Sequence, residues 1–374
     1  MPFPECVPEL TDGVTRLRAH RQGDAQRIVE QSTDPDSLRW TTVPAPYGLI
    51  QAQDFLTEIE AGWNAAGGVR YWAICAAADP HELYQGTIDL RPRSGSGLAA
   101  VGYGLHPEGR GRHLMSGALR LVGRYWFEQC GGARLTWTAI GGNLGSWAVA
   151  RSAGFTFDVV VPSCTALRTG EIVDEWQGSR DAGTPAHART PWHRAPAAAS
   201  VRAAHAGIRF RDWRPEDGQF LEEHDHRAHW LPSRGIPTPD SFSAWLSRRR
   251  LYEARGMACG WCLADAETDR PLGDVCLFAN DSPFAAGGVA ELGYWVSPSA
   301  RGRAVARAGV EGAMAFAFAA DGLGLRRVIA ETAADNVASN RVLEVAGFTI
   351  WGREAEAVAP DGSFGPAHHW ERIG

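Results

Sequence analysis

The chain repeats one pattern twice, and this repeat limits its fold more than any other feature. The stretch GYGLHPEGRGRHLMSGAL at 102–119 returns as GYWVSPSARGRAVARAGV at 293–310. Each copy is followed by Asn-x-x-Ser, starting at Asn143 and Asn336, and then by Ala-Gly-Phe. Such an internal repeat predicts two copies of one fold. We therefore expect any difference in function to lie where the two copies differ.

The overall composition narrows the class of protein. A chain of 374 residues is long enough for two domains of about 170 residues each. With 37 basic and 43 acidic residues its net charge is -6, which disfavours nucleic acid and anionic membranes as partners. The seven cysteines are scattered, the N-terminus lacks a secretory pattern, and no apolar run approaches the length of a membrane span. We expect a soluble, cytoplasmic protein with free thiols.

Apolar spacing and turn residues predict matching elements in the two halves. In the first half we expect helices over 23–32, 52–63 and 111–129 and strands over 15–18, 71–76, 85–90 and 134–139. In the second half we expect helices over 241–253 and 303–320 and strands over 260–264, 273–278 and 327–332. A short helix should begin at each Asn-x-x-Ser. Small residues, Pro and His over 178–206 predict a linker between domains 12–177 and 207–374.

One loop in the second half is suited to phosphate. The run Arg301-Gly302-Arg303-Ala304-Val305-Ala306 lies where a strand turns into a helix. Backbone N–H groups and the positive end of the helix dipole meet there. Gly302, Ala304 and Ala306 are small enough to let a pyrophosphate approach the amides, and Arg301 and Arg303 add positive charge.

With the neighbouring motifs, this loop resembles that of the GNAT superfamily of acyl-CoA-dependent N-acyltransferases, which reads Gln/Arg-x-x-Gly-x-Gly/Ala. The runs 291–296 (ELGYWV), 335–341 (DNVASNR) and 346–348 (AGF) resemble its ribosomal-protein N-terminal acetyltransferase branch. The resemblance covers about 160 residues of each half. It implies an α/β (α+β) fold of two GNAT-like domains, each a mixed, twisted, splayed sheet flanked by helices. Acetyl-CoA would be the co-substrate, its pantetheine bound by the backbone of Trp295, Val296 and Ser297.

The resemblance also implies direct acyl transfer from the thioester to an amine. An ammonium group must lose a proton before it attacks, and we assign Glu291 as the general base. Ser339 would act as an acid or polarise the sulfur, and Asn336 would hold the pantetheine. Other interpretations are a solvent-facing Glu291 and an Asn336 that only caps the short helix. We expect Tyr294 to be a wall residue.

The first copy departs from this pattern. Ala100 stands opposite Glu291, and His113 and Met115 replace Ala304 and Ala306. Their bulk should block the pyrophosphate, which predicts a degenerate domain over 12–177 beside a catalytic domain over 207–374. The alternative is that His113 is a replacement base in a second active site.

Two further groups of residues have alternative interpretations. Cys259 and Cys262 have the spacing of a redox pair, but on a strand they should face opposite sides, as core thiols do. His226 and His229 share a helical face with Glu222, and His224 lies nearby. These side chains suit a metal, the acceptor groove or a solvated surface. We expect no metal.

Together these features predict an acetyl-CoA-dependent N-acetyltransferase acting through its C-terminal domain on a small-molecule or peptide N-terminal amine. The alternative from another class is a non-catalytic acyl-CoA-binding or scaffolding protein, which Ala304 in place of glycine keeps open. A third interpretation has two working sites. The two halves are expected to form an internal pseudo-dimer, with homo-oligomers as a further option.

Overall fold

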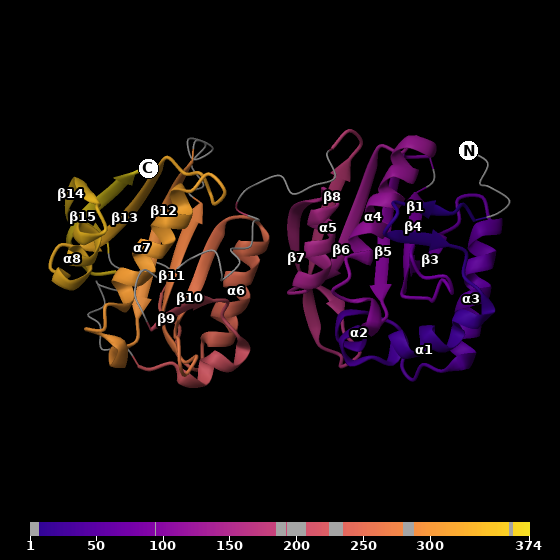
Figure 1. Cartoon of the computed structure of the whole chain (residues 1–374), viewed down its shortest axis with the longest axis horizontal. Helices are drawn as coiled ribbons and strands as arrows, with labels where there is room; N and C mark the ends of the chain where they lie inside the picture. The colour runs from indigo at the N-terminus through magenta and orange to yellow at the C-terminus, as the bar shows by residue number, and fades with distance from the viewer. Residues whose placement is uncertain are drawn as a thin grey trace. The chain divides into compact units, whose positions relative to one another are not determined.

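The chain folds into two compact units, Met1–Arg189 and Thr190–Gly374 (Figure 1). The structure is a computed structural model, and it describes residues 7–93, 95–184, 192, 207–223, 235–279, 288–358 and 362–374. In these described parts, no helix is both long and apolar enough to cross a membrane. Each unit contains one mixed sheet with helices against it, which confirms the predicted fold class.

The first unit is built on an eight-stranded sheet of order β1-β2-β3-β4-β5-β6-β8-β7. Its strands are β1 (Leu10–Thr11), β2 (Thr15–Arg18), β3 (Arg70–Ala76), β4 (Gly86–Arg93), β5 (Leu98–Leu105), β6 (Arg134–Ile140), β7 (Thr156–Ala166) and β8 (Ile172–Asp181). Its helices are α1 (Ala25–Thr33), α2 (Pro35–Trp40), α3 (Leu49–Asn64), α4 (Leu114–Arg124) and α5 (Leu144–Ser152). Helix α4 continues as a π-helical turn over Tyr125–Gln129.

The second unit repeats this plan on a seven-stranded sheet of order β14-β15-β13-β12-β11-β10-β9. Its strands are β9 (Ile208–Arg211), β10 (Ala258–Asp265), β11 (Pro271–Ala279), β12 (Val289–Val296), β13 (Arg327–Ala333), β14 (Thr349–Val358) and β15 (Phe364–Ile373). Its helices are α6 (Phe242–Ala254), α7 (Val305–Phe318) and α8 (Val337–Val345). Short 3-10 turns cover Pro215–Phe220 (η5) and Pro298–Ala300 (η8).

Helices α7 and α6 cover opposite faces of the second sheet, and each packs on its own core. Successive side chains of a strand point to alternate faces, so neighbouring residues of β12 belong to different cores. Ala290 and Leu292 of β12 belong to the core beside α7. Trp295 of β12 belongs to a separate core with Trp213 and Trp245, on the side of α6. This alternation places Glu291 and Gly293 on the α6 face.

The structure adds several elements that the sequence did not predict. The hairpins β7–β8 and β14–β15 extend each sheet, and α2 adds a helix. Strand β8 ends at Asp181, so residues 178–181, which we predicted as linker, belong to the first sheet.

Candidate functional site

Each sheet splays at its single parallel pair of strands. Strand β12 pairs with β13 only from Val289 to Glu291, although β12 continues to Val296. In the first unit β5 pairs with β6 from Leu98 to Val101 and then continues to Leu105. The predicted splay is therefore present in both halves, and in the second half it opens immediately after Glu291.

Along β12, alternate residues turn their backbone N–H and C=O groups toward the opening between β12 and β13. The amide of Ser297 donates to the carbonyl of Leu272, at 2.8 Å, on the side of β11. Because alternate residues of an antiparallel strand turn their polar groups to opposite sides, Trp295 also faces β11, whereas Tyr294 and Val296 face the opening. Of the three residues expected to bind pantetheine through the backbone, only Val296 lies in this orientation.

The loop predicted to bind phosphate has two residues in the left-handed region. Gly302 has a φ of +74°, a left-handed conformation that favours glycine. Ala304 also lies in the left-handed region, with a φ of 58°, and caps α7, which begins at Val305. The first amides of α7 have no partner within the helix and point out of its N-terminus.

The first copy has the same loop backbone, with φ of 72° at Gly111 and 58° at His113. Met115 is in the core, at 3% exposure, so its bulk does not obstruct the loop as we predicted. His113 is exposed. Arg110 of this loop forms ion pairs with Asp34, which caps α2, and with Asp36 of α2. These two carboxylates oppose the approach of a phosphate.

Ser339 and Tyr294 meet where the splay approaches α8. Their hydroxyl oxygens are 2.5 Å apart, and the Tyr294 hydroxyl also donates to the Ser339 carbonyl at 3.2 Å. Burial, against the opposing effect of this hydrogen bond, raises the pKa of Tyr294 to about 12, so the phenol is protonated at neutral pH. Asn336 caps α8, since its Oδ1 accepts from the Ser339 amide at 3.1 Å. Tyr294 also packs against the core of the second unit, and its expected place as a wall or core residue stays a prediction.

The corresponding serine of the first half is fully engaged by the chain. Ser146 Oγ accepts from Trp137 Nε1 at 3.0 Å and donates to the Tyr103 hydroxyl at 3.1 Å. Trp137 lies on β6 beside the splay and is 1% exposed. Its counterpart by the repeat is Ala330, which pairs with the buried Trp370, whereas Trp137 pairs with Gly178.

The α6 face of the second sheet carries Glu291 above a buried ion pair. Glu291 is half-buried and lies opposite Phe278 of β11. Arg249 of α6 binds Asp274, and both side chains are 6% exposed. Trp213 Nε1 adds a hydrogen bond to Asp274 at 2.8 Å. Sequence patterns did not indicate this pair, because its members are far apart in the chain and belong to no motif.

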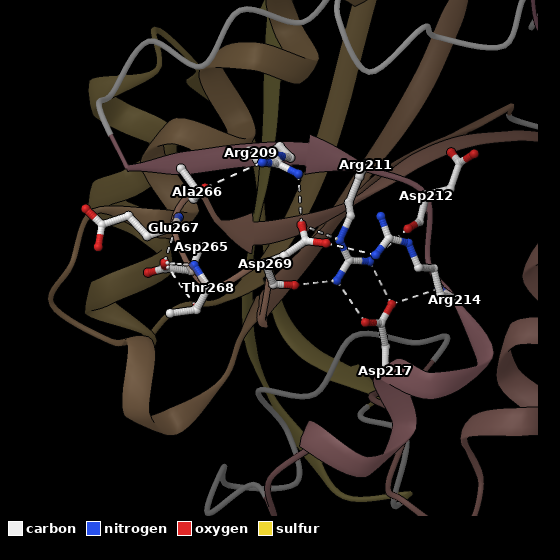
Figure 2. A network of polar contacts seen from close by, with 10 residues as sticks. All are labelled: Arg209, Arg211, Asp212, Arg214, Asp217, Asp265, Ala266, Glu267, Thr268 and Asp269. Atoms are coloured by element: carbon white, nitrogen blue, oxygen red, sulfur yellow. Dashed lines mark hydrogen bonds and ion pairs between the residues drawn. The ribbon is translucent and has the colours of Figure 1, made fainter.

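A network of arginines and carboxylates supports the start of the second unit (Figure 2). Arg211 donates to both oxygens of Asp217, at 2.7 and 2.8 Å, and Asp269 forms ion pairs with Arg209, Arg211 and Arg214. The first unit repeats it with Arg16, Arg18, Arg21, Asp24 and Glu82.

In the second unit the adjacent turn also binds Arg303, a residue of the loop predicted to bind phosphate. Asp265 Oδ2 accepts from Arg303 at 2.9 Å. Hydrogen bonds from the Thr268 amide, from Arg303 and from other donors lower the pKa of Asp265 to about 2. Its carboxylate therefore stays ionised and keeps Arg303 beside the loop.

The remaining candidates have different outcomes. Cys259 and Cys262 lie in different cores on opposite faces of β10, and burial raises the pKa of both thiols, as expected of core thiols. His224, His226 and His229 lie outside the described residues. Glu222 accepts hydrogen bonds from the amide and the hydroxyl of Ser299. Among the residues that the structure describes, no three His, Cys, Asp or Glu side chains are grouped to hold a metal.

Comparison with known proteins gives one family. The acetyltransferase (GNAT) domain model matches residues 15–156 and again 208–349. No curated protein matches the chain.

Among solved structures, similar ones include a GNAT-family acetyltransferase from Bacillus anthracis, 15% identical, with a TM-score of 0.41, covering 46% of this chain and 98% of its own. RimJ from Mycobacterium smegmatis, in complex with CoA-disulfide, is 17% identical with a TM-score of 0.42, covering 48% and 88%. A putative ribosomal-protein-serine acetyltransferase from Vibrio cholerae is 17% identical with a TM-score of 0.40, covering 48% and 99%.

Proposed function

The chain belongs to the acetyltransferase (GNAT) domain family and carries two such domains, and on this premise we propose that its second domain transfers an acetyl group from acetyl-CoA to a primary amine. The first domain would then be a degenerate partner that binds no acyl-CoA. The acceptor would be a small molecule or a peptide N-terminus, and the transfer would be direct, without a covalent enzyme intermediate.

The observation that carries this proposal is the position of Glu291. Its carboxylate lies at the last paired residue of β12, where the two strands part. A base at this point could remove a proton from an amine that reaches the thioester through the opening. The first domain has Ala100 at the corresponding position.

The other residues of the second domain fit the remaining steps. The loop amides of residues 304–306, together with Arg301 and Gly302, would bind the pyrophosphate, with Arg303 held nearby by Asp265. The backbone of Val296 and Tyr294 would bind the pantetheine. Ser339, whose hydroxyl is held by Tyr294, would donate a hydrogen bond to the sulfur as the C–S bond breaks. Asn336 would keep Ser339 in place as the cap of α8.

Comparison of the two halves supports inactivity of the first. Both serines contact a tyrosine, but Ser146 also accepts from Trp137, and Asp34 and Asp36 lie beside the loop at Arg110. A cofactor in the first half would have to displace these contacts.

The substitution Glu291→Gln tests the catalytic assignment. We expect kcat for amine acetylation to fall by about 100-fold or more, since general bases contribute about 10²–10⁴, while acetyl-CoA affinity changes little. The matched variant Ala100→Glu of the first domain should leave kcat unchanged. An unaltered rate in Glu291→Gln would remove Glu291 from the mechanism.

A non-catalytic acyl-CoA-binding protein is the second candidate, and Ala304 favours it. An L-residue in the left-handed region costs about 1–2 kcal/mol, and the family's usual glycine would avoid this cost. This candidate predicts acetyl-CoA binding without acetylation of any amine by the unaltered chain.

A further inference from the structure

Glu253 is a carboxylate on the acceptor face that the proposed mechanism does not yet use. It lies in the last turn of α6, and its Oε1 is 3.9 Å from Arg249 Nε. Its side chain keeps 37% of its surface exposed, although protein atoms crowd the carboxylate itself. The group is therefore both desolvated and within reach of a ligand.

Glu253 and Glu291 lie on the same face of the sheet, with Phe278 between them. A short turn joins α6 to β10, so Glu253 lies near Ala258, the first residue of that strand. Ala258 pairs with Phe278, and Phe278 pairs with Glu291. Ala258 and Glu291 are thus two strands apart, or about 10 Å. An amine bound over Phe278 on this face would lie between the two glutamates.

Glu253 shares its nearest cation, Arg249, with Asp274. Arg249, whose guanidinium also lies over the rings of Trp245 and Phe278, is neutralised by Asp274. Burial raises the pKa of Glu253 to about 7; Arg249 and Arg250 oppose this rise, whereas Asp212 and Asp274 add to it. The neighbouring thiols Cys259 and Cys276 are neutral, because burial raises the pKa of both.

The positions of Arg249, Glu253 and Asp274 carry uncharged residues in the first domain. Aligning Phe55-Leu56 with Trp245-Leu246 places Ile59 opposite Arg249 and Trp63 opposite Glu253. The strand register places Thr87, which faces Gly104, opposite Asp274, which faces Trp295. The first domain thus has apolar or neutral residues at all three positions.

We propose that Glu253 is a second carboxylate of the acceptor site and accepts the proton that the acceptor ammonium releases before transfer. This inference rests on the proposed function. The first proton moves from nitrogen to the Glu253 carboxylate, and the free amine attacks the thioester carbon. A C–N bond forms and the C–S bond breaks. The second nitrogen proton, removed by Glu291, ends on the departing sulfur as CoA thiol, and Glu253 releases the first to solvent.

The primary test is the pH dependence of acetyl transfer by the full chain, with acetyl-CoA and an amine found by screening primary amines. We expect wild-type kcat/KM to fall below pH 7 as Glu253 takes up a proton. Glu253→Gln should lose this acidic limb and lower kcat/KM by about 10- to 100-fold, with acetyl-CoA affinity retained. Glu253→Asp should recover part of both. Glu344→Gln, which removes an exposed ion-paired glutamate of α8, should change neither.

Stability separates this role from a structural one. The pKa of Glu253 is higher in the folded than in the unfolded chain, so its ionisation disfavours the fold, and stability falls as pH rises from about 4.5 to 7. Glu253→Gln should therefore melt about 2–4 °C higher at pH 8 and unchanged at pH 4. A structural residue would instead lower the melting temperature when it is replaced.

Several results would overturn the inference. One is an active wild type whose rate and pH profile are unchanged in Glu253→Gln. Another is a Glu253 pKa near that of an ordinary glutamate, measured by ¹³C NMR on the acetyl-CoA-bound chain. A wild type that binds acetyl-CoA but acetylates no amine would contradict the proposed function, and the catalytic role of Glu253 with it.

Discussion

Among single residues, Ser339 and its hydrogen-bond partner Tyr294 matter most for the proposed stabilisation of the departing sulfur. The two hydroxyls connect β12 to α8 across the splay. We expect Ser339→Ala to lower kcat by about 10- to 100-fold, because the departing thiolate loses its nearest donor. Tyr294→Phe should cause a smaller loss, since Ser339 keeps its position through Asn336. Steady-state kinetics with acetyl-CoA would measure both.

The first domain provides the control for this prediction. Ser146→Ala removes the corresponding hydroxyl, which is bonded to Trp137 and Tyr103, and should leave kcat unchanged. Equal losses in Ser146→Ala and Ser339→Ala would show that both domains contribute to turnover.

Sequence indicated some residues of this site and not others, for a physical reason. Glu291, Asn336 and Ser339 lie within short repeated motifs, so local spacing identifies them. Arg249 and Asp274 are identified only by their mutual burial, which depends on how α6 packs on the sheet.

At the scale of elements, each domain begins with a strand and a turn joined by a buried ion pair. Arg211 of β9 and Asp217 of η5 are 6% and 3% exposed in their side chains. Asp217→Asn would remove the main partner of the Arg211 guanidinium, and breaking a buried pair typically costs about 3–5 kcal/mol of unfolding free energy. Because Asp269 also pairs with Arg211, we expect a loss of about 3 kcal/mol. Chemical denaturation would measure it.

The equivalent change in the first domain is Asp24→Asn, which removes the partner of Arg18. If the two domains unfold in separate transitions, each variant should shift a different one. A change below about 1 kcal/mol in either variant would mean that the pair stabilises its domain no more than a surface salt bridge does.

Buried strands could be predicted from the sequence more readily than exposed ones. Strands β3, β10 and β11 are almost wholly buried, and their apolar runs predicted them. The hairpin strands β7 and β14 are mostly exposed, so their residues lack the alternation that identifies a half-buried strand. Helix α2 has six residues and no buried side chain, too little for a periodic signal.

At the scale of the whole molecule, the question is how many acetyl-CoA molecules one chain binds. The two loops share their backbone conformation, so backbone geometry alone predicts two sites. The side chains predict one, because Asp34 and Asp36 place two carboxylates beside the first loop and Ala100 stands where the second domain has Glu291. We therefore expect calorimetric titration of the full chain to give one site.

Charge reversal in each loop identifies which domain holds that site. Arg301→Glu places a carboxylate beside the bound pyrophosphate and should weaken binding at least about 10-fold, a cost of about 1.4 kcal/mol. Arg110→Glu would also repel Asp34 and Asp36, so Arg110→Gln is its matched control, and neither should alter the affinity.

Two sites in the unaltered chain would contradict the degenerate first domain. Binding that is lost only with Arg110→Glu would assign the co-substrate to the first domain, and no binding at all would leave a tandem acetyltransferase fold with a non-catalytic role.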